Sequence, residues 1–157
     1  DPLRYVHNEI GYNYRLTNIL SALGVAQLEQ LPTILKRKKE IFNQYKSAVE
    51  NIDGITLSIG PDYAENNHWL NLLQINTEIY GYDRDSIMNK FKENYIQVRP
   101  VWKLNHERKP YQRCQSYKID KAPELVSNSL CIPSNNNLTK LDINNVINNI
   151  DYSNPHK

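Results

Sequence analysis

The sequence is poor in cysteine and contains no long apolar run. Cys114 and Cys131 are far apart and form no CxxC motif, which argues against a disulfide scaffold and a cysteine-based zinc site. The histidines are scattered and predict no metal cluster: His7, His68, His106 and His156. No stretch approaches the ~18–20 consecutive apolar residues of a membrane span. We therefore expect two free thiols, no metal and no transmembrane helix.

A strong charge of either sign is also missing. The formal net charge of +2 gives no reason to expect nucleic acid or a membrane surface as partner. The basic run Lys36–Lys39 lies between apolar pairs at helical spacing, so we predict a solvated helix face there. With 157 residues, 39% hydrophobic and 23% charged, the chain is typical of one globular domain or slightly more, with a buried core.

The given sequence starts without an initiator methionine. Its first residue is Asp1, and Met88, its single methionine, falls inside a predicted helix. No Arg-rich, apolar or small-residue leader precedes the first motif, so nothing predicts secretion and we expect a cytoplasmic protein. Because that motif begins almost at the first residue, we expect a C-terminal piece of a longer protein.

The first third of the chain has a helical apolar pattern. It predicts a helix from Thr17 to about Asn51, ended by Asp53–Gly54. Pro32 separates two apolar faces and should break or kink the helix near Gln30–Leu31. The first face comprises Leu16, Ile19, Leu20, Leu23, Leu28 and Leu31, and the second comprises Ile34, Leu35, Ile41, Phe42, Tyr45 and Val49.

Shorter patterns follow this helix. Alternating apolar residues predict strands at 55–59 and 96–102, and a run rich in large apolar residues predicts one at 68–75. Because Pro100 cannot donate a ladder hydrogen bond, the 96–102 strand should end there or lie at a sheet edge. In the segment 68–75, we expect Trp69 to be a core residue. Residues 103–121 have no clear period and predict a long loop.

Three further helices are predicted. Asp83 is the N-cap of a helix with Ile87, Met88, Phe91 and Tyr95 on one side. A second helix runs from about 122 to 130, and a capping box at Thr139–Asp142 opens a third. This order of elements predicts an α+β fold in which helices cover a short, mostly antiparallel sheet, preceded by a long kinked helix.

The segment Glu9–Ile19, EIGYNYRLTNI, is the first candidate site. Asn13 and Arg15 lie where a polar loop enters the helix, and two strong donors beside a helix N-terminus favour an anion. Asn13 would donate its amide N–H to a phosphate, and Arg15 would bind an anion with its planar guanidinium. Alternatively, Asn13 caps a turn and Arg15 pairs with a carboxylate such as Glu9.

The second candidate site is the strand end and loop RPVWKLNHERKPY. Arg99, Trp102, His106 and Tyr111 supply a guanidinium, an indole, an imidazole and a phenol, which suit a nucleotide diphosphate and a uracil or sugar ring. Alternatively, Trp102 is a core anchor, Tyr111 fixes the loop and His106 is merely exposed. His68 is more typical of a satisfied histidine than of a catalytic one.

These motifs together resemble a known family. GYNYRLTNI with the small-residue helix after it, the RPVW strand end, NNHWL and the closing LCIPS and NLT segments resemble the DegT/StrS-type nucleotide-sugar aminotransferases, in order from about Tyr5 to Ile150. The resemblance implies a fold type I aminotransferase dependent on pyridoxal 5'-phosphate. It implies that residues 1–52 are the end of the large cofactor domain with the linking helix, and that 53–157 are the small C-terminal domain.

The resemblance also implies roles for the candidate residues. Asn13 would contact the cofactor phosphate in a neighbouring subunit of a homodimer, with Arg15 beside it in a role that varies within the family. Arg99, Trp102, His106 and Tyr111 would lie on the substrate side. The expected reaction is amination of a nucleotide-linked 4-keto-6-deoxy sugar for glycan or polysaccharide synthesis, with glutamate as the usual donor.

The lysine that binds the cofactor covalently in this family lies upstream of the matching segment, and no lysine here has its context. We therefore expect these residues alone to be inactive. The alternatives are a non-catalytic assembly module and a nucleotide-sugar-binding module.

Overall fold

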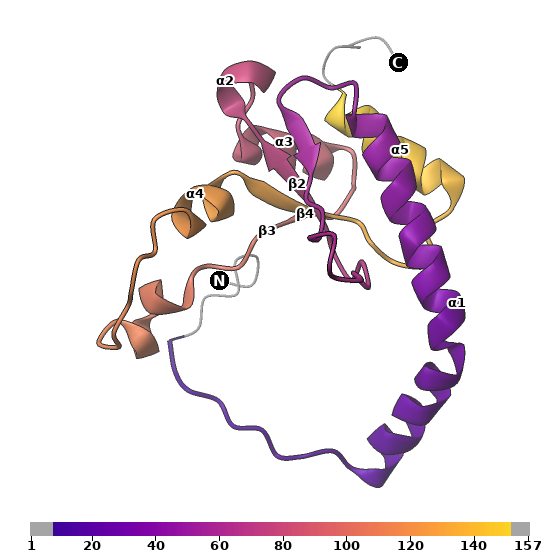
Figure 1. Ribbon diagram of the computed structural model, residues 1–157, viewed down its shortest axis with the longest axis vertical. Coiled ribbons are helices and arrows are strands. Elements are labelled where there is room, and N and C mark those ends of the chain that lie inside the picture. The colour runs from indigo at the N-terminus through magenta and orange to yellow at the C-terminus, as the bar shows by residue number, and fades with distance from the viewer. Residues whose placement is uncertain (1–7, 152–157) are drawn as a thin grey trace.

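A computed structural model describes residues 8–151, so Tyr5, His7 and His156 lie outside the described residues. Within them, a long helix, α1 (Asn18–Val49), precedes the strands β1 (Ile55–Leu57), β2 (Asn71–Ile75), β3 (Arg99–Pro100) and β4 (Ser129–Ile132). The other elements are α2 (Thr77–Tyr80), α3 (Arg84–Glu93), the 3₁₀ turns η1 (Asn105–Glu107) and η2 (Lys109–Tyr111), α4 (Ala122–Ser127) and α5 (Lys140–Ile150). Figure 1 shows the sheet with α1 and α5 on one side of it.

The four strands form one antiparallel sheet in the order β1-β2-β4-β3. The predicted α+β fold is therefore confirmed, and β3 with Pro100 lies at an edge as expected. The prediction of helix through Leu130 is wrong, because α4 ends at Ser127 and Leu130 belongs to the central strand β4. A short apolar run that is buried on both faces lacks the alternation that marks a strand in sequence.

The core is formed by the sheet and one side of three helices. In β2 the buried positions Asn71, Leu73 and Ile75 alternate with half-buried ones. The helical contributors are Ile41, Phe42, Tyr45 and Val49 from α1, Ile87 and Phe91 from α3, and Ile143, Val146 and Ile150 from α5. The apolar stripe of α5 is thus a core surface. Of the predicted second face of α1, only the part from Ile41 onward is buried, because Ile34 is half-buried and Leu35 is exposed. Burial of these core surfaces removes apolar area from water, which is the main stabilising contribution to such a fold.

Helix α1 has two halves with different environments. It continues through Pro32, so of the two outcomes predicted there a break does not occur. Proline lacks the N–H that would bond to the carbonyl of Leu28, but the turns on both sides keep their own bonds. The first apolar face is exposed, with Ile19 at 77% and Leu23 at 58% of their full accessibility. In contrast to the second half, this half packs against nothing within the described residues.

Two helices begin at the predicted caps. The Asp83 carboxylate accepts a hydrogen bond from the backbone N–H of Ser86 at 2.8 Å. Thr139 and Asp142 form a complete capping box at the start of α5. The prediction that Tyr95 lies on the apolar side of α3 is wrong, because the helix ends at Glu93 and Tyr95 is 99% exposed with a φ of 58°.

The basic run in α1 is only partly the solvated face that its sequence predicts. The Arg37 guanidinium donates to the carbonyl of Leu138 at 2.5 Å, and Lys38 Nζ donates to the carbonyls of Trp69 at 3.2 Å and Ser134 at 2.7 Å. Both side chains are half-buried against chain far away in sequence. The run therefore attaches the segments before β2 and after β4 to the helix.

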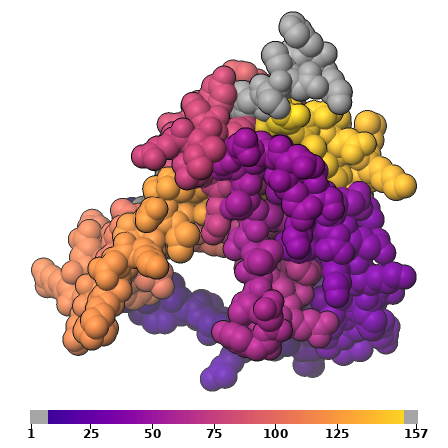
Figure 2. Space-filling view, turned by 45° about the horizontal axis from the view of Figure 1, so that its top comes forward, coloured from indigo at the N-terminus to yellow at the C-terminus, as the bar shows by residue number. Residues whose placement is uncertain are grey.

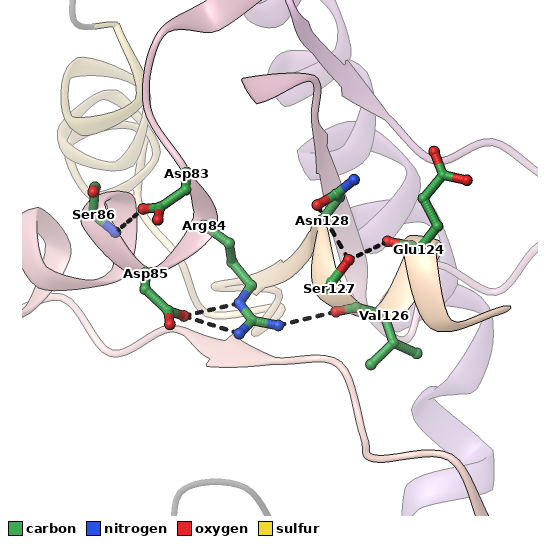
Figure 3. A network of polar contacts seen from close by, with 8 residues as sticks. All are labelled: Asp83, Arg84, Asp85, Ser86, Glu124, Val126, Ser127 and Asn128. Carbon is green, nitrogen blue, oxygen red and sulfur yellow. Dashed lines mark hydrogen bonds and ion pairs between the residues drawn. The ribbon is translucent and has the colours of Figure 1, made fainter. Parts of the chain in front are cut away.

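A polar network joins α3 to α4 (Figure 3). The Arg84 guanidinium pairs with Asp85 at 2.9 Å and donates to the carbonyl of Val126 at 3.0 Å. The hydroxyl of Ser127 donates to the carbonyl of Glu124 at 2.8 Å and closes the end of α4. These contacts fix the chain that follows the long loop 103–121.

Candidate functional site

The first candidate site lies on an exposed arm. Residues 8–17 run as an extended coil into the start of α1, apart from the sheet (Figure 1). The side-chain oxygen of Asn13 accepts the backbone N–H of Arg15 at 2.9 Å, and Arg15 has a φ of 84°. Asn13 therefore closes a turn, which was the alternative interpretation of its role. That bond uses the acceptor oxygen and leaves the amide NH₂ as a donor.

Both donors of this site are available. Within residues 8–151 the NH₂ of Asn13 and the guanidinium of Arg15 form no hydrogen bond or ion pair, and the alternative pairing of Arg15 with Glu9 does not occur there. The helix behind them is capped by Thr17, whose hydroxyl accepts the N–H of Leu20 at 3.4 Å. The first turn of α1 carries no acidic residue, so no carboxylate of that turn competes with an anion for the positive end of the helix dipole.

Two of the predicted substrate-side residues come together in the long loop. His106 on η1 and Tyr111 on η2 line one groove of about 490 Å³ with Leu104, Cys114, Tyr117 and Ile119 among others. The segment that carries them projects as a lobe from the sheet in Figure 1 and again in Figure 2. The groove combines apolar walls with an imidazole and a phenol, as sites for organic ligands often do.

Arg108 between the two 3₁₀ turns was missed in the sequence. It is 8% exposed, and its Nε donates to the carbonyl of Lys103 at 3.2 Å. Its carbonyl accepts the N–H of Tyr111 at 2.8 Å, and its own N–H donates to Asn105 at 3.0 Å. Arg108 is therefore a loop-organising residue. A single arginine in a polar stretch gives no sequence signal for such burial.

The other two predicted residues lie at the sheet edge. Arg99 is half-buried on β3, opposite Cys131, and Trp102 follows the strand with 41% of its surface exposed. Trp102 stacks on Trp69, with ring centroids 5.9 Å apart and an interplanar angle of 21°. Neither Arg99 nor Trp102 lines the groove of His106 and Tyr111. The structure thus brings His106 and Tyr111 together in one groove and leaves Arg99 and Trp102 outside it.

Trp69 was expected in the core and is not there: it is 64% exposed. The residue before it takes the protected position, since the His68 ring stacks on Phe42 with centroids 4.2 Å apart. Burial, followed by the positive charges of Lys39 and Lys38, lowers the pKa of His68 below its ordinary value. The structure therefore shows a stacked, neutral imidazole, and the assignment of His68 as satisfied rather than catalytic stays a prediction.

Comparison with known proteins supports the resemblance seen in the motifs. The model of the DegT/DnrJ/EryC1/StrS aminotransferase family matches residues 2–151. EpsN of Bacillus subtilis (strain 168), provisionally named a pyridoxal phosphate-dependent aminotransferase, is 34% identical over 92% of this chain and 38% of its own length. The GDP-perosamine synthase of Vibrio cholerae is 32% identical over 69% of this chain and 29% of its own length.

Solved structures share the fold. DesI, whose structure was determined in the presence of its TDP-sugar product, superposes with a TM-score of 0.77 at 20% identity over 83% of this chain and 34% of its own. PseC of Helicobacter pylori, an aminotransferase of pseudoaminic acid biosynthesis, gives 0.76 at 19% identity over 90% of this chain and 38% of its own. The chain thus spans about two fifths or less of the length of these relatives. Within residues 8–151, no helix combines the length and hydropathy of a membrane span.

Proposed function

Because the chain belongs to the DegT/DnrJ/EryC1/StrS aminotransferase family, we propose that the complete protein is a pyridoxal phosphate-dependent aminotransferase that aminates a nucleotide-linked 4-keto-6-deoxy sugar. The family match over residues 2–151 carries the proposal. The cofactor, when bound, supplies an electron-withdrawing ring that allows the amino group to be exchanged. The residues described here contribute binding and orientation.

Asn13 and Arg15 are the proposed phosphate-binding residues. The turn that Asn13 closes with the N–H of Arg15 orients its amide and leaves the NH₂ to donate. Arg15 adds a permanent positive charge on the same exposed arm. An arm that extends from its own domain suits a contact with a second subunit, and we therefore include a homodimer with shared sites in the proposal.

The substrate-side residues of the proposal are Arg99, Trp102, His106 and Tyr111. Arg99 would neutralise a phosphate, Trp102 would stack on a planar or sugar ring, and the groove of His106 and Tyr111 would hold the rest of the ligand. Glutamate as amino donor, a cytoplasmic location and a role in surface-polysaccharide or glycan synthesis complete the proposal. The names of the related GDP-perosamine synthases support a nucleotide-sugar substrate.

The experiment for the cofactor role uses the complete enzyme. Asn13→Ala should weaken retention of pyridoxal phosphate about tenfold, the size expected for one hydrogen bond to a charged group. Dialysis followed by absorbance of the bound cofactor measures this. Asn43→Ala, an exposed amide on the far half of α1, is the matched control and should retain the cofactor. Equal retention in both variants would contradict the role of Asn13.

We also propose that residues 1–157 alone do not transaminate, because the family's cofactor lysine lies on a segment upstream of those matched here. Incubating the 157-residue chain with pyridoxal phosphate, reducing with borohydride and mapping lysines by mass spectrometry tests this. We expect no stoichiometric adduct at a defined lysine. Such an adduct together with transaminase activity would contradict the proposal that the catalytic lysine lies upstream of residues 1–157.

The alternative is a non-catalytic module for assembly or for binding a nucleotide sugar. The groove beside His106 is the observation that favours it. Transamination by the complete protein distinguishes the two proposals, because UDP binding in the groove would agree with either. Absence of transamination, together with calorimetry in which the 157-residue chain binds UDP and His106→Ala abolishes the binding, would support the binding module.

A further inference from the structure

Trp69 and Trp102 form the one stacked indole pair that the chain can make, because it has only two tryptophans. Each tryptophan lies just outside a different strand. Trp69 precedes β2 and Trp102 follows β3, and β4 lies between these two strands in the sheet. Trp69 is 64% exposed and Trp102 is 41% exposed. Folding therefore brings two large apolar rings together at the surface and buries neither of them completely.

The backbone of Trp69 is held from several directions. The side chain of Asn67 accepts its N–H at 3.0 Å, and Lys38 Nζ donates to its carbonyl at 3.2 Å. The preceding His68 has a φ of 49°, and its N–H is bound by Asn66 at 2.8 Å. A left-handed conformation is unfavourable for a residue other than glycine, so it persists only where the surroundings enforce it.

The attachment of this segment to α1 is equally specific. His68 stacks on Phe42, and Lys38 also donates to the carbonyl of Ser134 at 2.7 Å. Ser134 in turn accepts the N–H of Asn71 at 2.8 Å at the start of β2. The backbone around Trp69 is therefore attached to helix α1, to the start of β2 and to the chain after β4. The exposed indole extends from a segment whose backbone is fixed by these contacts.

We propose that Trp69 is a positioning residue for Trp102: its fixed ring sets the plane in which Trp102 receives the planar base of the nucleotide sugar. This inference rests on the proposed function, since it assigns the partner of a proposed substrate-side residue. Trp102 lies between β3 and the long loop 103–121, so its ring depends on a neighbour such as Trp69 for its orientation. A near-parallel ring on one side of Trp102 restricts its rotation, and the proposal requires a ligand ring to stack on the opposite side.

The pair has a spectroscopic signature that does not depend on activity. Two stacked indoles couple their electronic transitions and give an exciton couplet in circular dichroism, and in the 157-residue chain no other tryptophan contributes. Trp69→Phe and Trp102→Phe should each remove the couplet from the folded protein. A couplet that survives either substitution would show that the rings do not stack in solution.

The kinetic test uses the complete enzyme with a UDP-linked keto sugar as probe. Trp69→Ala should raise KM by about three- to tenfold with little change in kcat, the range expected for losing one aromatic pair. Trp69→Phe should restore most of the affinity because it keeps a ring behind Trp102. Tyr63→Ala is the matched control, an exposed aromatic residue ahead of the same strand that makes no ring contact with a described residue.

The outcomes separate the two proposals. A raised KM for Trp102→Ala with an unchanged KM for Trp69→Ala would overturn the positioning role and keep the proposed function. Absence of transamination in the unsubstituted complete enzyme would overturn the proposed function, while the couplet would still report on the pair. Equal losses for Phe and Ala at position 69, accompanied by a lowered melting temperature, would show a structural role only and overturn the inference.

Discussion

Tyr45 combines a well-packed ring with a hydroxyl that lacks a hydrogen-bond partner within the described residues. Its side chain is fully buried in the core beside α5, but its hydroxyl has no hydrogen-bond partner within residues 8–151. Burial, together with the negative charge of Asp142, raises the pKa of this phenol well above its ordinary value, so it stays neutral. A buried hydroxyl without a partner costs free energy, whereas the ring around it stabilises the core.

Replacing Tyr45 separates these two contributions. Tyr45→Phe removes the unpaired hydroxyl and keeps the ring, so we expect the free energy of unfolding to rise by about 1 kcal/mol. Tyr45→Ala leaves a cavity and should lower it by about 3–5 kcal/mol. Urea unfolding of the 157-residue chain measures both, with Tyr63→Phe as the exposed control. Destabilisation by Tyr45→Phe would mean that the hydroxyl is bonded in solution.

Helix α5 depends on its capping box. Asp142 Oδ2 accepts the backbone N–H of Thr139 at 2.8 Å and its hydroxyl at 2.7 Å, and these bonds lower the pKa of the Asp142 carboxyl. A carboxyl whose pKa is lower in the folded state stabilises the fold above its unfolded pKa. That contribution disappears as the pH falls through the folded pKa.

The capping box can be tested by mutation and pH together. Thr139→Ala should lower the free energy of unfolding at neutral pH by about 1 kcal/mol, the usual effect of losing an N-cap. Asp142→Asn should also destabilise at neutral pH, and its difference from the unsubstituted chain should shrink in acid. Denaturant unfolding over an acid-to-neutral pH series measures this, with Asp62→Asn in an exposed loop as control. A difference that is constant with pH would contradict the charged cap.

The two halves of α1 should differ in stability. The half after Lys38 packs on the sheet and α5, while the half before Pro32 makes no such contacts within the described residues. A short helix without tertiary packing is marginal in water. In hydrogen exchange on the 157-residue chain, we expect amides 22–31 to exchange much faster than amides 41–49.

Pro32 contributes to this difference. Pro32→Ala restores a backbone N–H and relieves the clash of the ring with the preceding turn, so it should slow exchange in residues 22–31. Amides 41–49 serve as the internal control and should not change. Equal exchange rates in the two halves of the unsubstituted chain would show that the first half is packed in solution. A rate that also depends on protein concentration would assign that packing to self-association.

The elements that sequence predicts well are those with a local cause. Asp83 and Thr139 cap their helices through residues three positions ahead, so the pattern alone identifies them. Strand β4 was missed because Leu130–Ile132 is buried on both faces and shows no period. The family resemblance was confirmed by the comparison, whereas the proposed domain boundary at residues 52 and 53 remains a prediction.

The site shows the same division. Asn13 and Arg15 are two positions apart, so their common loop was evident, and His106 and Tyr111 share a groove because the loop is short between them. The pairing of Trp69 with Trp102 depends on the strand order β2-β4-β3, which no local pattern reveals. Whether these residues bind cofactor and substrate remains a prediction for the experiments above.

At the scale of the whole molecule, the chain combines a packed α+β body with an unpacked apolar surface. This exposed face consists of Leu16, Ile19, Leu20, Leu23 and Leu28. Single exposed apolar residues are common, but a contiguous apolar stripe on one helix marks an interface. In the proposed enzyme this face packs on the large domain, and the 157-residue chain would have to cover it in another way.

We therefore expect the 157-residue chain to self-associate through the exposed face. Sedimentation velocity over a concentration series should show a dimer or larger species, and Leu20→Glu combined with Leu23→Glu should return the chain to a monomer, because charges on the face oppose its burial. Leu141→Glu, an exposed leucine on α5, is the matched control and should leave association unchanged. A monomer at all concentrations with an intact α1 would instead favour the autonomous module, since a free enzyme fragment should not tolerate this surface in water.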